Sequence, residues 1–258
     1  MKVYKFGGAS VKDAAGVRNI ASIVGAEEER LFVVVSAMGK MTNALEKLLG
    51  TFYDGKTAQA LERLQEIVDF HNGIIEELWG RPFLPDRVAR FYMELEETVA
   101  SSNPAVRDYE VWYDRIVGYG ELISTSIVSE YLAAQGVANT WVDMRECFVT
   151  TARHKDANVD LERSAERLVP LVEATDSRVY VGQGFIGATE DGAPTTIGRE
   201  GSDYSAAAVG YILGAGSVTI WKDVKGILNG DPKRFDDVRL IPEMNYLDAI
   251  ELAYSGAQ

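Results

Sequence analysis

Short apolar segments alternate with longer amphipathic segments along the chain, and this alternation is the feature that most restricts its possible folds. Parallel strands need a long crossover between them, usually a helix, so the alternation predicts an α/β fold with a mainly parallel sheet. The predicted strands cover residues 3–6, 31–35, 137–142, 178–181 and 217–221. The predicted helices cover residues 11–29, 43–52, 57–100 with a break at Pro82 and Pro85, 111–134, 161–173, 203–213 and 246–254.

The composition argues against several classes of protein. The 258 residues, 47% of them hydrophobic, suffice for one sizeable domain or for a domain with two lobes. A formal net charge of -13 argues against nucleic acid or an anionic membrane as a partner. We find neither a signal peptide nor an apolar run of membrane-spanning length, and we therefore expect a cytoplasmic protein. The single cysteine, Cys147, excludes an intrachain disulfide, and His71 and His154 are too far apart in sequence to predict a zinc site.

Residues 195–206 have the composition of an anion-binding segment, because two glycines, an arginine and an aspartate precede a stretch of small residues with a helical pattern. Gly198 and Gly201 would let a ligand approach the backbone, and Ser202 is predicted to cap the helix. The N–H groups and the dipole at a helix start attract phosphate or carboxylate, and Arg199 could add a bidentate contact. Such helix starts also occur in proteins that bind nothing there.

A lysine and two glycines stand at the end of the first predicted strand. Lys5 lies near the strand's carboxyl end, and Gly7 and Gly8 form a turn at the edge where open α/β sheets bind ligands. Lys5 could therefore reach phosphoryl oxygens. The alternative is a lysine whose apolar stem covers the surface beside a tight turn. The spacing differs from the Walker motif G-x-x-x-x-G-K-[ST].

Polar residues also follow two other predicted strands. Ser36 and Thr42 come after the second strand and could face the same rim, although Thr42 could instead cap the next helix. Lys222 and Asp223 come after the last strand and precede a loop with Gly and Pro at residues 226–233. This loop could enclose a nucleotide or be an ordinary surface loop.

Glu121 interrupts an apolar helical pattern. A buried carboxylate at this position would be costly unless a cation contacted it, and the ammonium group of a substrate could do so. The alternative is that Glu121 faces solvent.

Taken together, these segments resemble the catalytic domain of the aspartate kinases, in the amino acid kinase superfamily. The resemblance covers nearly the whole chain, and its motifs occur in order: Lys5-Phe6-Gly7-Gly8-Ala9-Ser10-Val11, Val35-Ser36-Ala37, Thr42-Asn43, Gly120-Glu121-Leu122, Gln183-Gly184-Phe185-Ile186-Gly187, Thr195-Thr196-Ile197-Gly198-Arg199, Gly201-Ser202-Asp203-Tyr204, Trp221-Lys222-Asp223-Val224 and Asp231-Pro232. The resemblance implies a three-layer αβα fold, with an N-terminal lobe for aspartate and a C-terminal lobe for ATP.

The resemblance also implies a reaction. The γ-phosphoryl group of ATP would pass to the side-chain carboxylate of L-aspartate, giving 4-phospho-L-aspartate, the first step toward the aspartate-family amino acids, lysine and threonine among them. Mg²⁺ is expected on the phosphates. The partners implied are L-aspartate and ATP, with neither nucleic acid nor a membrane as a partner. A homo-oligomeric state is possible.

The resemblance assigns roles to individual residues. Lys5 and Asp203 would be catalytic: Lys5 would hold the transferring phosphoryl group, and Asp203 would orient Lys5 and help organise the metal-nucleotide end. Arg199 would bind the α-carboxylate of aspartate and Glu121 its ammonium group. The resemblance assigns the other residues to two binding sites: Ser36 and Thr42 to the aspartate site, and Gly7, Gly8, Lys222, Asp223, Leu228 and Lys233 to the nucleotide site. No protein residue is assigned as a metal ligand.

Three residues depart from the family's usual pattern, namely Ala9, Leu228 and Gln258, where threonine, tyrosine and lysine are frequent. A kinase of the same fold that acts on another carboxylate, such as glutamate or acetylglutamate, and a non-catalytic relative are the alternatives. The family continues beyond the last helical pattern and then carries regulatory ACT domains. We therefore expect residues 1–258 to be a kinase domain truncated at its C-terminus, with low activity alone and no inhibition by lysine or threonine.

Overall fold

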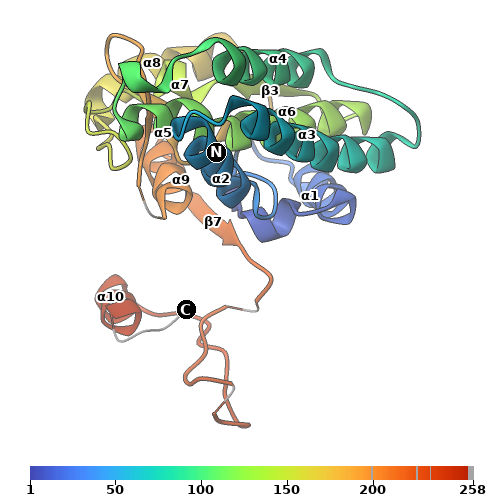
Figure 1. Cartoon of the computed structure of the whole chain (residues 1–258). Coiled ribbons are helices and arrows are strands. Elements are labelled where there is room, and N and C mark those ends of the chain that lie inside the picture. The colour runs from blue at the N-terminus through green and yellow to red at the C-terminus, as the bar shows by residue number, and fades with distance from the viewer. Residues whose placement is uncertain (199, 225, 233, 255–258) are drawn as a thin grey trace. The chain divides into compact units, whose positions relative to one another are not determined.

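The computed structural model describes residues 1–198, 200–224, 226–232 and 234–254 (Figure 1). The chain divides into two compact units, Met1–Trp221 and Lys222–Gln258, and each is described by itself. No described helix is both long and apolar enough to cross a lipid bilayer.

The first unit is built on a five-stranded parallel sheet with the strand order β3-β4-β2-β1-β7. The strands are β1 (Lys2–Phe6), β2 (Leu31–Val35), β3 (Asn139–Val142), β4 (Val179–Gln183) and β7 (Ser217–Trp221). The parallel sheet and its five strands confirm the predicted α/β class. All five residues of β2 are buried, as expected for a strand covered on both faces.

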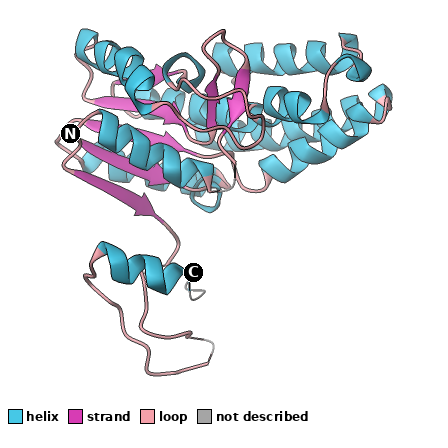
Figure 2. Ribbon diagram, turned by 90° about the vertical axis from the view of Figure 1, so that its left-hand side faces the viewer, coloured by secondary structure: helices cyan, strands magenta, loops and turns pink. Residues whose placement is uncertain are grey.

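Helices cover both faces of this sheet (Figure 2). Val33 and Val35 of β2 belong to an apolar cluster with residues of α1, α3, α4 and α6, whereas Phe32 and Val34 belong to a second cluster with residues of α7, α8 and α9. Alternate residues of one strand thus face opposite helical layers, and the expected three-layer αβα arrangement is confirmed. A third cluster joins α2, α3, α4 and α5 beside the sheet.

The helices of the first unit have the following bounds: α1 (Ala14–Ala26), α2 (Met41–Tyr53), α3 (Thr57–Trp79), α4 (Asp86–Ser101), α5 (Tyr109–Val117), α6 (Tyr119–Ala134), α7 (Met144–Cys147), α8 (Leu161–Ala174) and α9 (Gly201–Ile212), with two 3₁₀ turns, η1 (Gly8–Val11) and η2 (Pro104–Val106).

Several sequence predictions need correction. The helix predicted over residues 111–134 is two helices, α5 and α6, which meet at Gly118. A Cβ atom at Gly118 would lie 3.2 Å from Ile186 Cγ2, so glycine allows a close approach at this junction. The strand expected from residue 137 begins at Asn139. An antiparallel pair, β5 (Ile186–Ala188) and β6 (Pro194–Thr196), was not predicted, because three residues are too few to show a period.

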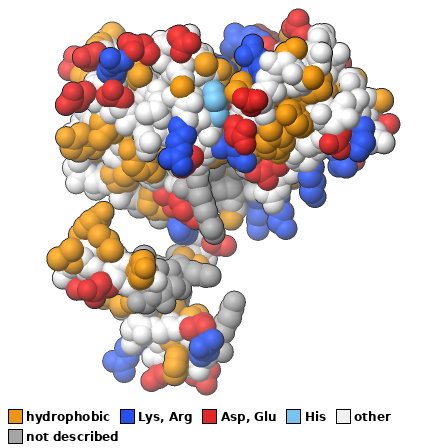
Figure 3. All heavy atoms as spheres, turned by 60° about the vertical axis from the view of Figure 1, so that its left-hand side comes forward, with side chains coloured by type: hydrophobic (Ala, Val, Ile, Leu, Met, Phe, Trp, Pro, Cys, Tyr) orange, Lys and Arg blue, Asp and Glu red, His pale blue; other side chains and the backbone are white. Residues whose placement is uncertain are grey.

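Charged side chains of both signs are interspersed with apolar ones on the face drawn in Figure 3. On this face the net charge of -13 is thus not expressed as a surface of one sign. An acidic net charge is therefore compatible with basic side chains at a binding site.

The described residues of the second unit include α10 (Tyr246–Tyr254), as predicted, and an isolated antiparallel bridge between Leu228 and Leu240. Backbone hydrogen bonds flank this bridge, with Asn229 N donating to Arg239 O at 3.0 Å and Ile241 N donating to Ile227 O at 2.9 Å. The described part of the loop predicted over residues 226–233 is thus held in part by backbone hydrogen bonds to residues 239–241.

Candidate active site

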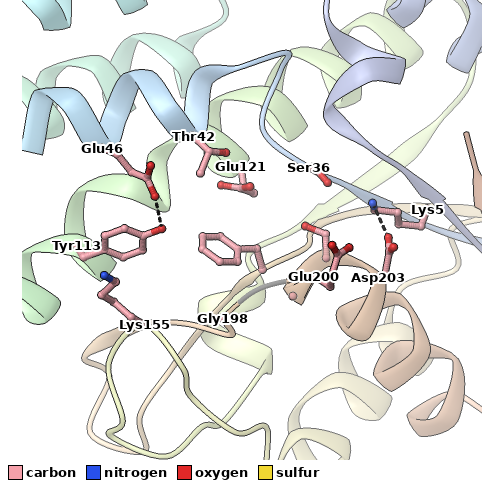
Figure 4. A pocket seen from close by; sticks show the side chains of 13 residues that line it. Lys5, Ser36, Thr42, Glu46, Tyr113, Glu121, Lys155, Gly198, Glu200 and Asp203 are labelled. Carbon is pink, nitrogen blue, oxygen red and sulfur yellow. Dashed lines mark hydrogen bonds and ion pairs between the residues drawn. The ribbon is translucent and has the colours of Figure 1, made fainter. Parts of the chain in front are cut away.

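A cavity of about 500 Å³ opens where β1 and β2 end, within the first unit (Figure 4). Side chains reach it from β1, the loop after β2, α2, α5, α6 and the start of α9. It therefore lies at the carboxyl edge of the parallel strands, where α/β proteins of this kind bind ligands. The cavity brings together five of the residues to which the sequence assigned a catalytic or binding role, namely Lys5, Ser36, Thr42, Glu121 and Asp203.

Lys5 and Asp203 form an ion pair at one end of the cavity (Figure 4). Lys5 Nζ lies 2.5 Å from Asp203 Oδ1, and the Lys5 side chain is only 9% exposed. A lysine this buried needs a counter-charge, and the first turn of α9 supplies it. Asp203 thereby holds the ammonium group in a fixed position.

Gly7 and Gly8 bring backbone close to this lysine. A Cβ atom at Gly7 would lie 3.5 Å from Lys5 Nζ. A Cβ atom at Gly8 would lie 2.9 Å from the carbonyl oxygens of Ala37 and Gly39, and Gly39 N donates a hydrogen bond to Gly8 O at 3.0 Å. The turn after β1 thus packs against the loop after β2, which leaves no room for a side chain at position 8.

Glu121 is buried in the first turn of α6, so the solvent-exposed alternative is wrong. Its Oε1 atom accepts a hydrogen bond from Ala37 N at 3.1 Å, whereas its Oε2 atom has no hydrogen-bond partner among the described residues. Burial raises the pKa of Glu121 to about 8, and the Ala37 hydrogen bond and the charge of Lys5 oppose that rise only in part. A cationic ligand in the cavity would satisfy the unpartnered oxygen and favour the ionised carboxylate.

Ser36 and Thr42 line the same cavity from the loop after β2 and from α2. Ser36 is held by its backbone, because its carbonyl oxygen accepts a hydrogen bond from Ser124 Oγ at 2.8 Å. Thr42 lies inside the first turn of α2, whose N-cap position is Lys40, so the capping alternative for Thr42 is wrong. Ser36 and Thr42 thus each contribute a hydroxyl-bearing side chain to the lining of the cavity.

The start of α9 differs from the predicted cap. The N-cap residue is Glu200, in a left-handed conformation with φ 61°, and Ser202 lies within the first turn, so the prediction that Ser202 caps the helix is wrong. Two positive φ angles, at Gly198 and Glu200, turn the chain sharply into the helix. Gly198, Glu200, Gly201 and Ser202 all line the cavity.

Four further lining residues were not assigned a role from the sequence. Tyr113 Oη donates a hydrogen bond to Glu46 Oε1 at 2.8 Å, and Lys155 Nζ lies 4.6 Å from the centroid of the Tyr113 ring. Phe185 completes this group. Glu46 stands four residues after Thr42 on α2, and that helical spacing could have identified it. Lys155 gives no such signal, because it lies in a loop.

A buried carboxylate, Asp114, anchors that loop to α5. Its Oδ1 atom accepts hydrogen bonds from Thr196 Oγ1 at 2.6 Å and from Lys155 N at 3.1 Å, and its Oδ2 atom lies 2.6 Å from His154 Nδ1. Burial raises the pKa of Asp114, and these hydrogen bonds oppose the rise. His154 therefore has a structural contact here.

Five other predicted residues lie outside the described part of the first unit. Arg199 and Lys233 lie outside the described residues. Lys222, Asp223 and Leu228 belong to the second unit. Their predicted contacts with a nucleotide therefore stay predictions.

Comparisons with known proteins identify the family of the chain. The sequence profile of the amino acid kinase family matches residues 1–258. A chloroplastic bifunctional aspartokinase/homoserine dehydrogenase of Daucus carota is 33% identical over 99% of this chain and 28% of its own length. Lysine-sensitive aspartokinase 3 of Escherichia coli is also 33% identical, over 99% of this chain and 56% of its own.

A solved structure of E. coli aspartokinase III in complex with aspartate and ADP superposes with a TM-score of 0.85 and 31% identity, covering 98% of this chain and 56% of the other. The chain thus spans about half the length of its E. coli relative and 28% of the length of the carrot relative. Because the family profile matches from the first residue to the last, the chain belongs to the amino acid kinase family.

Proposed function

We propose that this chain carries the acceptor-binding and phosphoryl-transfer residues of an aspartate kinase. One observation carries the proposal: the Lys5–Asp203 ion pair and the unpartnered carboxyl oxygen of Glu121 line the same cavity. A fixed cation suits a transferring phosphoryl group, and a buried carboxyl group suits a substrate ammonium group. The similarity to a structure that holds aspartate and ADP supports the same assignment.

The reaction needs no general base. The side-chain carboxylate of aspartate is ionised at neutral pH and is already a nucleophile. One of its oxygens forms a bond to the γ-phosphorus of ATP, while the bond from that phosphorus to the bridging oxygen breaks and ADP leaves. Catalysis then consists of positioning the reactants and neutralising charge. Lys5, oriented by Asp203, neutralises charge on the transferring group, and the backbone N–H groups of Gly7 and Gly8 donate to it.

The acceptor amino acid binds in the part of the cavity that Glu121, Ser36 and Thr42 line. Glu121 binds the ammonium group of aspartate, Ser36 and Thr42 bind through their hydroxyl groups, and Arg199 binds the α-carboxylate. Glu121 favours a free amino acid over an acylated one, because an amide nitrogen carries no charge to balance a buried carboxylate.

The nucleotide is the second substrate, with Lys222, Asp223, Leu228 and Lys233 as its further contacts. Mg²⁺ binds oxygen ligands and usually takes only one or two protein carboxylates together with phosphates. Asp203 and Glu200 supply carboxylates at the Lys5 end of the cavity and fit that requirement (Figure 4). When bound, the metal would supply further neutralisation of phosphate charge.

A comparison of acceptors tests the proposal. Binding of L-aspartate, L-glutamate and N-acetyl-L-glutamate is measured by calorimetry, and ADP release is measured with each acceptor in the presence of MgATP. We expect L-aspartate to bind and to give the fastest ADP release. Preference for N-acetyl-L-glutamate would instead assign the chain to another carboxylate kinase, and the absence of binding by any acceptor would refute the proposed function.

A further inference from the structure

Lys155 holds an unusual backbone position at the rim of the cavity. Its φ angle is 64°, in the left-handed region that side chains other than glycine rarely adopt. The conformation is held from α5, because the carboxylate of Asp114 accepts the Lys155 N–H at 3.1 Å and contacts the His154 ring at 2.6 Å. The loop therefore presents Lys155 to the cavity from a fixed anchor.

The ammonium group of Lys155 lies against aromatic rings. Lys155 Nζ is 4.6 Å from the ring centroid of Tyr113 and 5.4 Å from that of Tyr109. The ion pairs formed by the neighbouring loop residues join Arg153 to Asp156 and His154 to Asp114, and neither includes Lys155. Cation–π contacts attract the group without neutralising its charge. Lys155 thus keeps a positive charge that an anionic ligand can use.

The two described lysines of the cavity lie at opposite ends of it. Figure 4 shows Lys5 beside Asp203 at one end and Lys155 beside Tyr113 at the other, with Glu121 and Thr42 between them. An amino acid with a carboxylate at each end and an ammonium group between them complements the order Lys155, Glu121 and Lys5. The other carboxylate at the Lys155 end, Glu46, accepts a hydrogen bond from Tyr113 Oη at 2.8 Å.

We propose that Lys155 binds the α-carboxylate of the acceptor amino acid, at the end of the cavity opposite Lys5. This inference rests on the proposed function and adds a second cation to the one assigned to Arg199. Lys155 then contributes to specificity, because it favours acceptors that carry a free carboxylate at the end remote from the transferred phosphoryl group.

A purely structural role for Lys155 gives a different expectation. If the lysine only stacks on the two tyrosines to hold its loop, its removal weakens all acceptors alike. The two roles are separated by a pair of ligands that differ only in the group Lys155 is proposed to contact. L-aspartate and L-isoasparagine are such a pair, since isoasparagine has a neutral amide in place of the α-carboxylate.

The experiment measures the Kd of both ligands by calorimetry, with competition for the weaker one, for the wild type and for Lys155→Met. We expect the Kd of L-aspartate to rise on the order of tenfold, which corresponds to about 1.4 kcal/mol. The Kd of L-isoasparagine should change less than about twofold, since the contact is absent with that ligand. Lys155→Arg should restore most of the affinity for L-aspartate.

Two further variants serve as controls. Arg153→Met removes one positive charge from the same loop at a side chain that is 70% exposed, and it should leave the Kd of L-aspartate within about twofold. Lys155→Gly removes the side chain at a φ angle that glycine adopts freely, so it keeps the loop conformation and should reproduce the loss seen with methionine.

The outcomes separate the inference from the proposed function. An unchanged Kd for L-aspartate in Lys155→Met, or an equal loss for both ligands, overturns the role of Lys155 and leaves the proposed function standing. A wild-type protein that binds no L-aspartate refutes the proposed function, and the inference fails with it.

Discussion

Replacing Glu121 by glutamine is expected to stabilise the protein while it weakens aspartate binding. Burial raises the pKa of Glu121 to about 8 from an ordinary value of 4.5. At pH 7 this difference corresponds to about 3 kcal/mol of lost stability, because the unfolded chain releases a proton that the folded protein retains. Glutamine carries no charge at any pH and keeps an oxygen that can accept the Ala37 N–H. The gain in free energy of unfolding should therefore approach 3 kcal/mol, or roughly 2–4 °C in Tm for each kcal/mol.

The stability difference between Glu121→Gln and the wild type should depend on pH, and the direction of that dependence follows from the raised pKa of Glu121. Below about pH 4.5 the carboxyl group is protonated in both states, and the wild type and Glu121→Gln should be equally stable. Between about pH 4.5 and 8 the folded wild type binds more protons than the unfolded chain, so its stability falls as the pH rises. The stability advantage of Glu121→Gln should grow over this range and become constant above it.

Thermal unfolding at a series of pH values measures this difference. Glu62→Gln, the same substitution at an exposed position of α3, is the matched control and should show no growing gap. An advantage of Glu121→Gln that does not increase with pH would refute the reasoning about burial. Aspartate calorimetry on the same variant tests the binding role, and an unchanged affinity would contradict it.

The remaining predictions concern catalysis, linkage and packing. Lys5→Ala should lower turnover by a factor on the order of 10² to 10³, since charge on the transferring group is no longer neutralised; near-normal ADP release in a coupled assay would remove Lys5 from the mechanism. Aspartate binding at pH 7 should release protons from Glu121, because an ammonium partner favours the ionised carboxylate; a binding heat that is identical in two buffers of different ionisation enthalpy would argue against this. Gly8→Ala should cost about 1–3 kcal/mol because its Cβ would lie 2.9 Å from two carbonyl oxygens, whereas Gly73→Ala, with open space around it in α3, should gain about 0.5–1 kcal/mol. Equal melting temperatures for these two glycine variants would contradict the packing argument.

The sheet was largely predictable from the sequence, because its strands are encoded locally. The five residues of β2 form one continuous apolar run between Arg30 and Ser36, and both ends of the strand were predicted correctly. The hairpin of β5 and β6 was not predictable in this way, since its pairing depends on two segments that are each too short to show a pattern.

The site was predictable where residues follow strand ends and unpredictable where they depend on distant contacts. Lys5 and Ser36 were found because parallel strands gather their carboxyl ends at one edge. The burial of Glu121 stayed open, because α6 is apolar around most of its surface and its pattern does not distinguish a solvent face. Lys155 was missed because its position is fixed by Asp114, a residue 41 positions earlier in the chain.

The junction at Gly118 has a consequence for how the specificity of such a kinase can change. Tyr113 and Glu121 reach the cavity from α5 and α6, on either side of that glycine. In one uninterrupted helix, residues this far apart would be separated by about 12 Å along the axis. The span between the two side chains therefore depends on how α5 and α6 are joined at Gly118, where a Cβ atom would lie 3.2 Å from Ile186 Cγ2. A mutation that changes this junction would lengthen or shorten the cavity without replacing any of the side chains that line it.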